Sequence, residues 1–465
     1  MHSIRVILIL FTLLQAAYTQ EPIEVIIEGK FQAHESNIAR FNSPLTTANN
    51  IIYLAYITPD LKTVVAQKKG PNWHISTVSE ITQDNPWHNA PSITVDEQGY
   101  VHILYNMHAT PWQYSMSSKP GDISNWLFRG QFAGENPGLG STGPSDCTGD
   151  CYNEWISEGT ADIPGNQVGY AFMTTDRNGK IYVAFRECFY CDASYHQRQR
   201  SGGIVTYNVE TKSWRRVGGI RPWATDSVYS PLGHHLFFDR NNRMHVSWVW
   251  GHHYTEEESS DAFWFNPNYP SYAFSDDGGK TFFTASGKKM NLPIDFTESE
   301  PVIDANWIQN PQENGYFWGY TEITAMPDGT PYILIFPRTE SKPEVRKAFL
   351  YYKQKWSQPL ALPWGGEDMV IDSKGIITVI SSGIRVHRSE DGGLTWKNSE
   401  IDMTGPYNII VDYNFVNHSD DIRFLAFKQD GADSFVRIYT LKFSHSKFDT
   451  LPPAPPQNIR TNTQH

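Results

Sequence analysis

The chain has 465 residues and a formal net charge of −12 at pH 7; 14% of its residues are aromatic and only 19% are charged. The acidic balance argues against a general nucleic-acid-binding surface, although a locally basic cleft could still hold an anionic substrate. The 29 prolines and 34 glycines are spread along the whole chain, and together with the ring-rich composition they favour strands and turns over long helices.

The first residues have the features of a secretory signal peptide. A basic residue precedes an apolar run over positions 6–14, and Ala17 and Thr19 form a small-residue cleavage site. The run is too short for a membrane span, and no second apolar run approaches that length. We therefore expect residues 1–19 to be a signal peptide and the mature protein to be exported without a membrane span; the alternative is a buried first strand.

One phrase recurs along the chain: an apolar pair, Asp, two or three turn residues that usually include Gly, and a second apolar stretch. Each copy reads as a strand, a tight turn and a second strand. The phrase predicts five β-hairpins, at residues 93–105, 173–185, 237–249, 324–336 and 370–381.

A second phrase, S-x-D-G-G-x-T followed by an aromatic residue, occurs at 275–283 and 389–397. This is the Asp-box, a turn in which Asp and Ser or Thr side chains bond backbone amides between two strands. So many related hairpins favour a repeat architecture over a two-sheet sandwich, and blade length alone allows seven or eight blades. We predict an all-β, seven-bladed β-propeller over residues 20–450, followed by a Pro-rich, polar tail at 451–465.

Four polar residues bracket the first two hairpins. His88 precedes the first hairpin and His108 follows it, whereas Tyr170 precedes the second and Arg186 ends it. Strand ends on one face of a propeller usually carry its site. Each residue taken alone would more often be a packed or surface residue, but their matching positions predict that all four meet at one rim as catalytic residues.

Further candidates lie beside these hairpins. Asn89 follows His88, Tyr229 precedes the third hairpin, and His252 follows it. We expect these residues and His245 to bind substrate. Because His245 lies inside a predicted strand, a structural role is the alternative for it.

The four cysteines fall in two close pairs, Cys147 with Cys151 and Cys188 with Cys191. In an oxidising compartment two local disulfides are the default interpretation. The alternative is a structural metal, zinc held by Cys188, Cys191 and His234 or else calcium. We expect no cofactor to be required for catalysis.

Several of these segments resemble the BNR-repeat polysaccharide lyases that cleave ulvan. The resemblance covers roughly residues 85–295 and is carried by HNAPSITVDEQGYVHILYNMHATPWQYSMS, GYAFMTTDRNGKIYVAFRE and SPLGHHLFFDRNNRMHVSWVW. It implies a seven-bladed propeller that cuts a sulfated, uronic-acid-containing polysaccharide by β-elimination and leaves an unsaturated uronate. The family's motif histidines resemble His88 and His108, its tyrosine Tyr170, and its carboxylate-neutralising arginine Arg186.

That chemistry requires such residues. Removing the C5 proton of a uronate adds charge to its carboxylate, which the guanidinium fork of Arg186 can stabilise. His88 and Tyr170 can share the roles of base at C5 and acid at the leaving C4 oxygen, with the assignment between them left open, and His108 would orient the site. We expect a monomer with an anionic polysaccharide substrate; the alternatives are a sialidase-like hydrolase and a non-catalytic carbohydrate-binding propeller.

Overall fold

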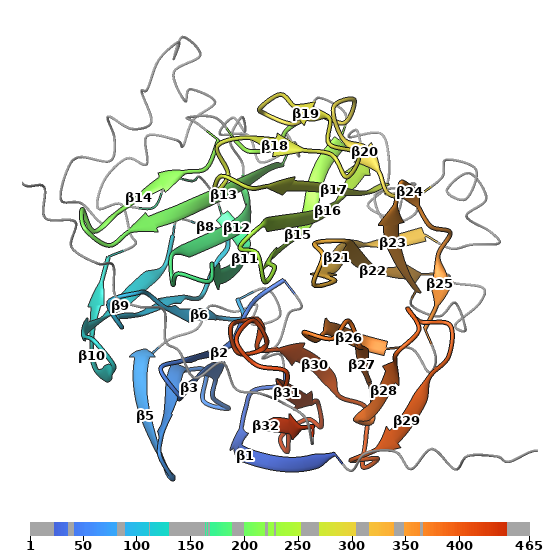
Figure 1. Cartoon of the computed structure of the whole chain (residues 1–465). Helices are drawn as coiled ribbons and strands as arrows, with labels where there is room; N and C mark the ends of the chain where they lie inside the picture. The colour runs from blue at the N-terminus through green and yellow to red at the C-terminus, as the bar shows by residue number, and fades with distance from the viewer. Residues whose placement is uncertain are drawn as a thin grey trace, which may run out of the picture.

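The structure is a computed structural model. It describes residues 23–35, 41–80, 89–110, 112–129, 163, 165, 168–187, 200–218, 222–226, 229–252, 269–303, 316–338, 348–362 and 366–443. These residues form seven antiparallel sheets that stand around a central axis (Figure 1). The predicted all-β, seven-bladed propeller is confirmed, while the predicted signal peptide and Pro-rich tail lie outside the described residues.

In the first six blades the main strands follow chain order from the innermost strand outward. The first three blades contain β2 (Leu45–Ala48), β3 (Ile51–Ile57), β4 (Thr63–Lys69) and β5 (Asn72–Ser79); then β6 (Ser92–Val95), β7 (Val101–Leu104), β9 (Tyr114–Lys119) and β10 (Asp122–Phe128); then β11 (Val168–Thr175), β12 (Ile181–Glu187), β13 (Ser201–Asn208) and β14 (Ser213–Arg216), with β8 (His108–Thr110) on the inner edge of β11.

The next three blades follow the same plan. They contain β15 (Tyr229–Phe238), β16 (Met244–His252), β17 (Tyr269–Ser275), β18 (Phe282–Phe283), β19 (Lys289–Met290) and β20 (Glu300–Pro301); then β21 (Tyr316–Ala325), β22 (Pro331–Arg338), β23 (Ala348–Lys353), β24 (Lys355–Trp356) and β25 (Leu360–Ala361); then β26 (Gly366–Ile371), β27 (Ile377–Ser381), β28 (Arg385–Ser389) and β29 (Lys397–Glu400).

The seventh blade closes the ring by joining the two ends of the propeller. Its inner strands are β30 (Asn408–Val411), β31 (Ile422–Lys428) and β32 (Phe435–Lys442), and its outer strand is β1 (Glu24–Gln32). The first residue of β1 pairs with the last residue of β32, so the blue and red ends of the ribbon lie side by side in Figure 1.

All five predicted Asp hairpins are confirmed as the inner two strands of blades 2 to 6. In the first of them, Asp96 Oδ1 accepts hydrogen bonds from the backbone N–H groups of Gln98 (3.0 Å) and Tyr100 (2.8 Å). The carboxylates of Asp176, Asp239 and Asp372 make the same pair of bonds in their own turns. The Asp therefore satisfies the backbone donors of the turn, which explains why the phrase repeats.

The two S-x-D-G-G-x-T turns also form the predicted bonds. Asp277 accepts from the backbone N–H groups of Lys280 and Thr281, both at 2.9 Å, and Ser275 Oγ donates to it at 2.8 Å. Asp391 makes equivalent bonds with Ser389 and Thr395.

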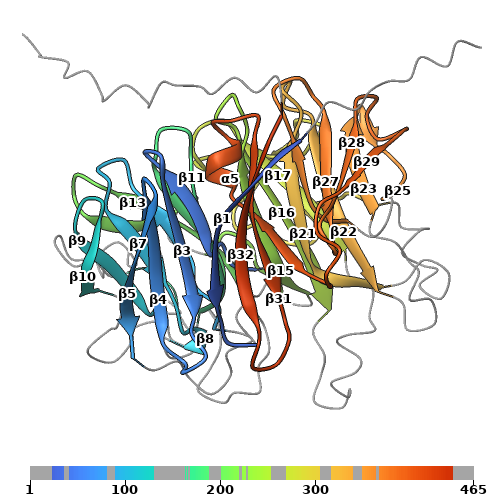
Figure 2. The ribbon, with the colours of Figure 1, turned by 90° about the horizontal axis from the view of Figure 1, so that it is seen from below.

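A short helix, α5 (Tyr413–Val416), lies on the face of the ring that carries the Asp turns (Figure 2). Its Asn414 Nδ2 donates to Thr46 Oγ1 (2.7 Å) and Thr94 Oγ1 (3.1 Å), and its Oδ1 accepts from Thr175 Oγ1 (3.0 Å). One side chain thus ties blades 1, 2 and 3 together.

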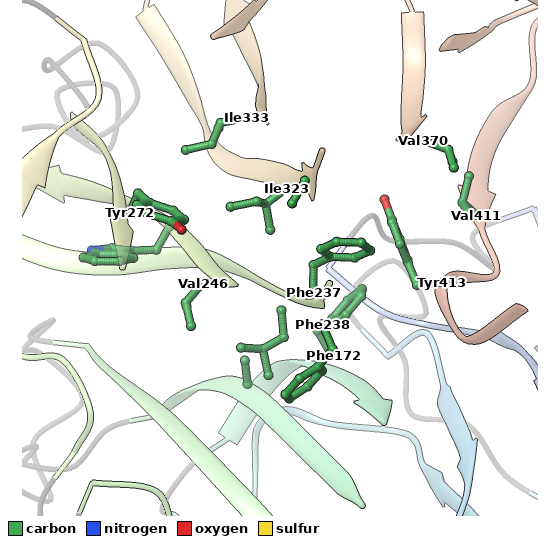
Figure 3. Close-up of a cluster of buried hydrophobic side chains, with 14 of the residues drawn as sticks. Phe172, Phe237, Phe238, Val246, Tyr272, Ile323, Ile333, Val370, Val411 and Tyr413 are labelled. Carbon is green, nitrogen blue, oxygen red and sulfur yellow. The ribbon is translucent and has the colours of Figure 1, made fainter. Parts of the chain in front are cut away.

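Apolar side chains from the inner strands pack around this helix. The rings of Phe172 and Phe237 lie against that of Tyr413, with centroids 6.3 and 6.1 Å away (Figure 3). Among the described residues, no helix has the length and apolar character needed to cross a membrane.

Candidate active site

Three adjacent strands place two of the predicted catalytic residues in one row. On the inner side of β11, Gly169 pairs with His108 of β8; on its outer side, Gly169 pairs with Arg186 of β12. Residues paired in this way project to the same face of a sheet. The row lies at the end of blade 3 that is opposite to the Asp176 turn.

Tyr170 joins this row through a β-bulge. The register of β11 on β12 shifts between Gly169 and Phe172, so Tyr170 and Ala171 together oppose one residue of β12. Tyr170 adopts a φ of 53°, the left-handed conformation that costs a residue with a Cβ roughly 1–2 kcal/mol. A bulge changes the direction of a side chain. In a regular strand Tyr170 would project to the face of the sheet opposite to that of His108 and Arg186, and the bulge turns it toward them.

The same bulge occurs in the next blade with a different residue in the strained position. The register of β15 shifts between Leu232 and His235, and Gly233 there has a φ of 58°. Glycine accepts this conformation without a steric penalty. Blade 3 therefore carries a tyrosine where blade 4 uses the residue that suits the backbone.

The three side chains are in contact. The Arg186 guanidinium carbon lies 4.4 Å from the centroid of the Tyr170 ring, and the His108 ring centroid lies 5.8 Å from it in an edge-on arrangement. All three are half-buried. The structure thus brings together His108, Tyr170 and Arg186, whereas the fourth predicted catalytic residue, His88, lies outside the described residues.

The route that delivers His108 differs from the prediction. The sequence analysis placed it at the end of the first hairpin, on blade 2. Instead, the chain leaves blade 2 after β7, and His108 begins β8, which pairs with β11 of blade 3. Three of the candidates therefore share one blade instead of two.

A buried ion pair fixes the strand end that carries Arg186. The next residue, Glu187, is fully buried and accepts two hydrogen bonds from Arg216, at 2.6 and 2.7 Å. Such a two-point pair in a buried setting holds its backbone rigidly. The sequence analysis missed this pair, because Arg216 is 29 residues further along the chain.

His234 lies beside this group as a buried, neutral imidazole. Burial, with the nearby charge of Arg186, lowers the pKa of His234 to about 3. Among the described residues its Nε2 has no hydrogen-bond partner, and a Cβ at Gly202 would stand only 2.2 Å from that atom. Glycine at position 202 therefore makes room for the ring.

The predicted metal site cannot be assembled from the part of the chain that the structure describes. Cys188 and Cys191, like the other cysteine pair at 147 and 151, lie outside the described residues. Within the described ranges, no group of three or more His, Cys, Asp and Glu side chains is placed to hold a metal ion. The choice between disulfides and a structural metal stays a prediction.

The predicted substrate-binding residues have different environments. Tyr229 is half-buried and stacks on Phe296, with ring centroids 4.2 Å apart. It begins β15, so it lies at the end of blade 4 that corresponds to the end of blade 3 where Tyr170 lies. The backbone of His252 pairs with that of Tyr229, which places it at the same end. Asn89 is only 2% exposed, so its side chain is packed inside the protein. Its backbone carbonyl accepts a hydrogen bond from the Asn106 N–H of blade 2.

The substrate-binding role predicted for His245 is corrected to a structural one. His245 is fully buried at the other end of its hairpin, with Nδ1 2.8 Å from the Tyr272 hydroxyl and Nε2 3.3 Å from Asp239 Oδ2. Burial lowers the pKa of His245 even though Asp239 opposes the shift. Both ring nitrogens are thus used to brace the Asp turn.

An identical arrangement in blade 2 supports this correction. His102 Nδ1 lies 2.7 Å from the Tyr114 hydroxyl, and its Nε2 lies 3.1 Å from Asp96 Oδ2. In both hairpins the His follows the Asp by six residues. This shared spacing is the sequence signal that marks His245 as a structural residue.

Sequence reasoning also missed Phe41. Its ring centroid lies 4.6 Å from that of Tyr170, although the residue precedes blade 1. No repeat phrase includes it, so nothing in the hairpin pattern points to its position.

Comparison with known proteins agrees with this geometry. Residues 51–360 match the family described as BNR repeat-containing family members, and the chain belongs to this family of β-propellers. It is also similar to an ulvan lyase from Nonlabens ulvanivorans, with 21% identity over 438 residues that cover 84% of each chain.

Two solved structures share the fold. An ulvan lyase of polysaccharide lyase family 25, bound to -[GlcA(1-4)Rha3S]-, aligns with a TM-score of 0.63 and 13% identity over 89% of this chain and 95% of that one. The polysaccharide lyase Uly1 aligns with a TM-score of 0.59 and 13% identity over 86% and 90%. At this identity the likeness establishes the fold.

Proposed function

We propose that this protein is an exported, monomeric polysaccharide lyase that cleaves ulvan, a sulfated polysaccharide containing uronic acid, by β-elimination. The observation that carries the proposal is the contact between Arg186 and Tyr170, with His108 at the edge of the same ring. The similarity to an ulvan lyase over most of both chains supports the choice of substrate.

In this proposal each group has a defined task. Arg186 grips the uronate carboxylate and stabilises the charge that develops when C5 loses its proton. The C5–H electron pair forms the C4–C5 double bond, the C4–O bond breaks, and the leaving oxygen takes up a proton. Tyr170 and His88 share the base and acid roles, and His108 orients the Tyr170 ring.

The first test is product analysis. Incubation with ulvan should release oligosaccharides that end in an unsaturated uronate, which absorbs ultraviolet light. Release of saturated oligosaccharides would indicate a hydrolase, and binding without release of any product would indicate a carbohydrate-binding propeller. Either result would refute the proposal.

Two substitutions test the assigned residues. Tyr170→Phe removes only a hydroxyl, so we expect an intact fold and a loss of about 10²–10⁴-fold in kcat. Arg186→Lys keeps the charge but loses the two-point grip on the carboxylate, so we expect a loss of about 10²-fold in kcat/KM.

Tyr352→Phe and Arg243→Lys, both on other blades, are the matched controls and should leave activity unchanged. Near-normal turnover in Tyr170→Phe would end its catalytic assignment.

A further inference from the structure

Residues 41–43, just before blade 1, lie along the inner edge of β11, although the two segments are about 130 residues apart in sequence. Ser43 Oγ donates to the Met173 carbonyl at 2.6 Å and accepts from the Met173 N–H at 3.0 Å. Asn42 Nδ2 donates to the Ala171 carbonyl at 3.3 Å. Among the described residues β8 pairs with β11 at Val168 and Gly169, so the backbone groups beyond the bulge bond to side chains instead: Met173 to Ser43, and the Ala171 carbonyl to Asn42 and to Ser92 Oγ, which donates at 2.5 Å.

This attachment sets Phe41 against Tyr170. Their ring centroids lie 4.6 Å apart and their planes meet at 51°. The Tyr170 ring is therefore packed between Phe41, the Arg186 guanidinium at 4.4 Å and the His108 ring at 5.8 Å. Since the backbone of Tyr170 is in a conformation that tyrosine disfavours, local preference does not fix the direction of the ring, and its packing partners must do so.

We propose that Phe41 is a positioning residue for Tyr170, held in place by the bonds of Asn42 and Ser43 to β11. It acts through Tyr170 by keeping the phenol ring against Arg186, so that the hydroxyl meets the reacting atoms of the uronate. This inference rests on the lyase function proposed above. A displacement of the hydroxyl by about 1 Å can cost on the order of 10²-fold in rate, whereas substrate binding through Arg186 would persist.

The first experiment compares kcat and KM on ulvan for two variants at position 41. Phe41→Leu should lower kcat about tenfold or more and leave KM within about twofold, and Phe41→Tyr, which keeps the ring, should restore most of kcat. Phe31→Leu is the matched control, because Phe31 is also half-buried and packs on Trp73 (4.9 Å) and Tyr56 (5.5 Å) away from the site. A Phe41→Leu enzyme with unchanged kcat, or equal losses in both Leu variants, would overturn the proposal.

The second experiment does not depend on turnover. Thermal unfolding is measured for Phe41→Leu and Phe31→Leu, each in the natural sequence and in a Tyr170→Gly background. If Phe41 packs on Tyr170 as proposed, the Tm loss caused by Phe41→Leu should shrink by about half or more in that background, while the loss caused by Phe31→Leu stays the same. Additive Tm shifts would overturn the contact. An enzyme without lyase products would refute the proposed function, and the Tm cycle would still decide whether Phe41 holds Tyr170.

Discussion

Tyr170 stands in a backbone conformation for which the neighbouring blade uses Gly233, and this comparison gives a direct test of strain. We expect Tyr170→Gly to be more stable than Tyr170→Ala by about 1 kcal/mol, because both variants lack the ring and only Ala keeps the Cβ penalty. In an ordinary strand the order is reversed, since Gly usually costs about 0.5–1 kcal/mol relative to Ala.

Chemical denaturation of the two variants measures the difference in the free energy of unfolding. Gly233→Ala in blade 4 is the control and should be destabilised by a similar amount, because it introduces a Cβ at the same bulge position. If Ala proved equal to Gly or better at position 170, the bulge would not be strained.

His235 predicts how the stability of the protein depends on pH. It is 3% exposed, its Nδ1 accepts from the Ile323 N–H at 3.2 Å, and burial lowers its pKa to about 3. In the unfolded chain its pKa is about 6.5, so below that pH the unfolded state binds a proton that the folded state refuses. The contribution of neutral His235 is therefore complete above pH 6.5 and is lost as the pH falls toward 3.

Replacing this histidine should flatten the pH dependence. In His235→Asn the amide oxygen can still accept from Ile323, but the titrating group is gone. Between pH 5.5 and 4 we expect the free energy of unfolding to fall less steeply than in the natural protein, by about 1.4 kcal/mol per pH unit. Urea unfolding at several pH values measures this slope, and His74→Asn on the exposed strand β5 should leave it unchanged. If the free energy of unfolding had the same pH dependence in the natural protein, His235→Asn and His74→Asn, buried His235 would not be the source of that dependence.

At the level of single residues, sequence reasoning succeeded where a side chain lay at the end of a predicted hairpin. Tyr170 and Arg186 meet because β11 and β12 are such a hairpin. It failed where the environment depended on another part of the chain: Phe41 reaches Tyr170 from before blade 1, and His245 is bonded to Tyr272 of a later strand. Period-two alternation indicates which side chains face inward, but it does not identify their partners.

Among the elements, β11 is supported by three other segments of the chain. Its inner edge is bonded at one end by β8, in the middle by Ser43 and at the other end by Asn414 of α5. The strand that holds the candidate site is thus attached to three separate segments of the chain.

The helix α5 should stabilise the ring without affecting the site. Asn414→Leu removes the hydrogen bonds to threonines of three blades, and their hydroxyl groups then lose a partner in a partly buried place. We therefore expect the free energy of unfolding to fall by about 1–3 kcal/mol. Because α5 lies on the opposite face, kcat should not change at temperatures where the variant is folded. Asn125→Leu is the control, because Asn125 is exposed and its side-chain amide donates to the neighbouring Ser124 Oγ at 3.0 Å. A variant with normal stability would show that the helix is dispensable.

The blades that sequence reasoning did not recognise are those in which the Asp phrase is absent, as in blade 1, or interrupted, as in blade 7. The inner hairpin of blade 1 turns through Asn49 and Asn50, with φ of 51° and 59°. In blade 7, Asp412 donates its N–H to the Arg423 carbonyl just as Asp96 does to the carbonyl of Tyr100, but α5 is inserted into the turn. Five copies of the Asp phrase and two Asp-boxes together predicted a propeller, and the two blades without a regular Asp phrase could be assigned only from the closed ring.

For the molecule as a whole, a polar cluster joins blades 7 and 1 where the ring closes. Glu28 of β1 forms an ion pair with Lys68 at 2.6 Å and accepts from Thr440 at 2.8 Å, and Arg423 donates to Thr47 at 2.7 Å. Burial alone would raise the pKa of Glu28, but these bonds and the nearby charges lower it below its usual value. The stabilising charge of Glu28 is thus present above its unfolded pKa and is lost as the pH falls.

Two substitutions on the same strand separate closure from surface charge. Glu28→Gln weakens the partly buried cluster, so we expect the free energy of unfolding to fall by about 1–2 kcal/mol, after allowing for solvent screening. Glu24→Gln removes an exposed ion pair with Lys442 at 3.7 Å and should cost less than about 0.5 kcal/mol. Equal effects of the two changes, measured by urea unfolding at pH 7, would show that the cluster does not stabilise closure.

The pairing of β1 with β32 also determines when the protein can finish folding on the ribosome. At about 5–20 residues per second, roughly 20 to 80 s separate the synthesis of Glu24 from that of its partner Lys442. Throughout this interval β1 has no sheet to join, and its Val25 and Ile27 side chains, which remain exposed even in the closed ring, offer an apolar edge to other nascent chains. A substitution that delays the last pairing would therefore accumulate an open ring with six finished blades, and its first consequence would be aggregation during synthesis.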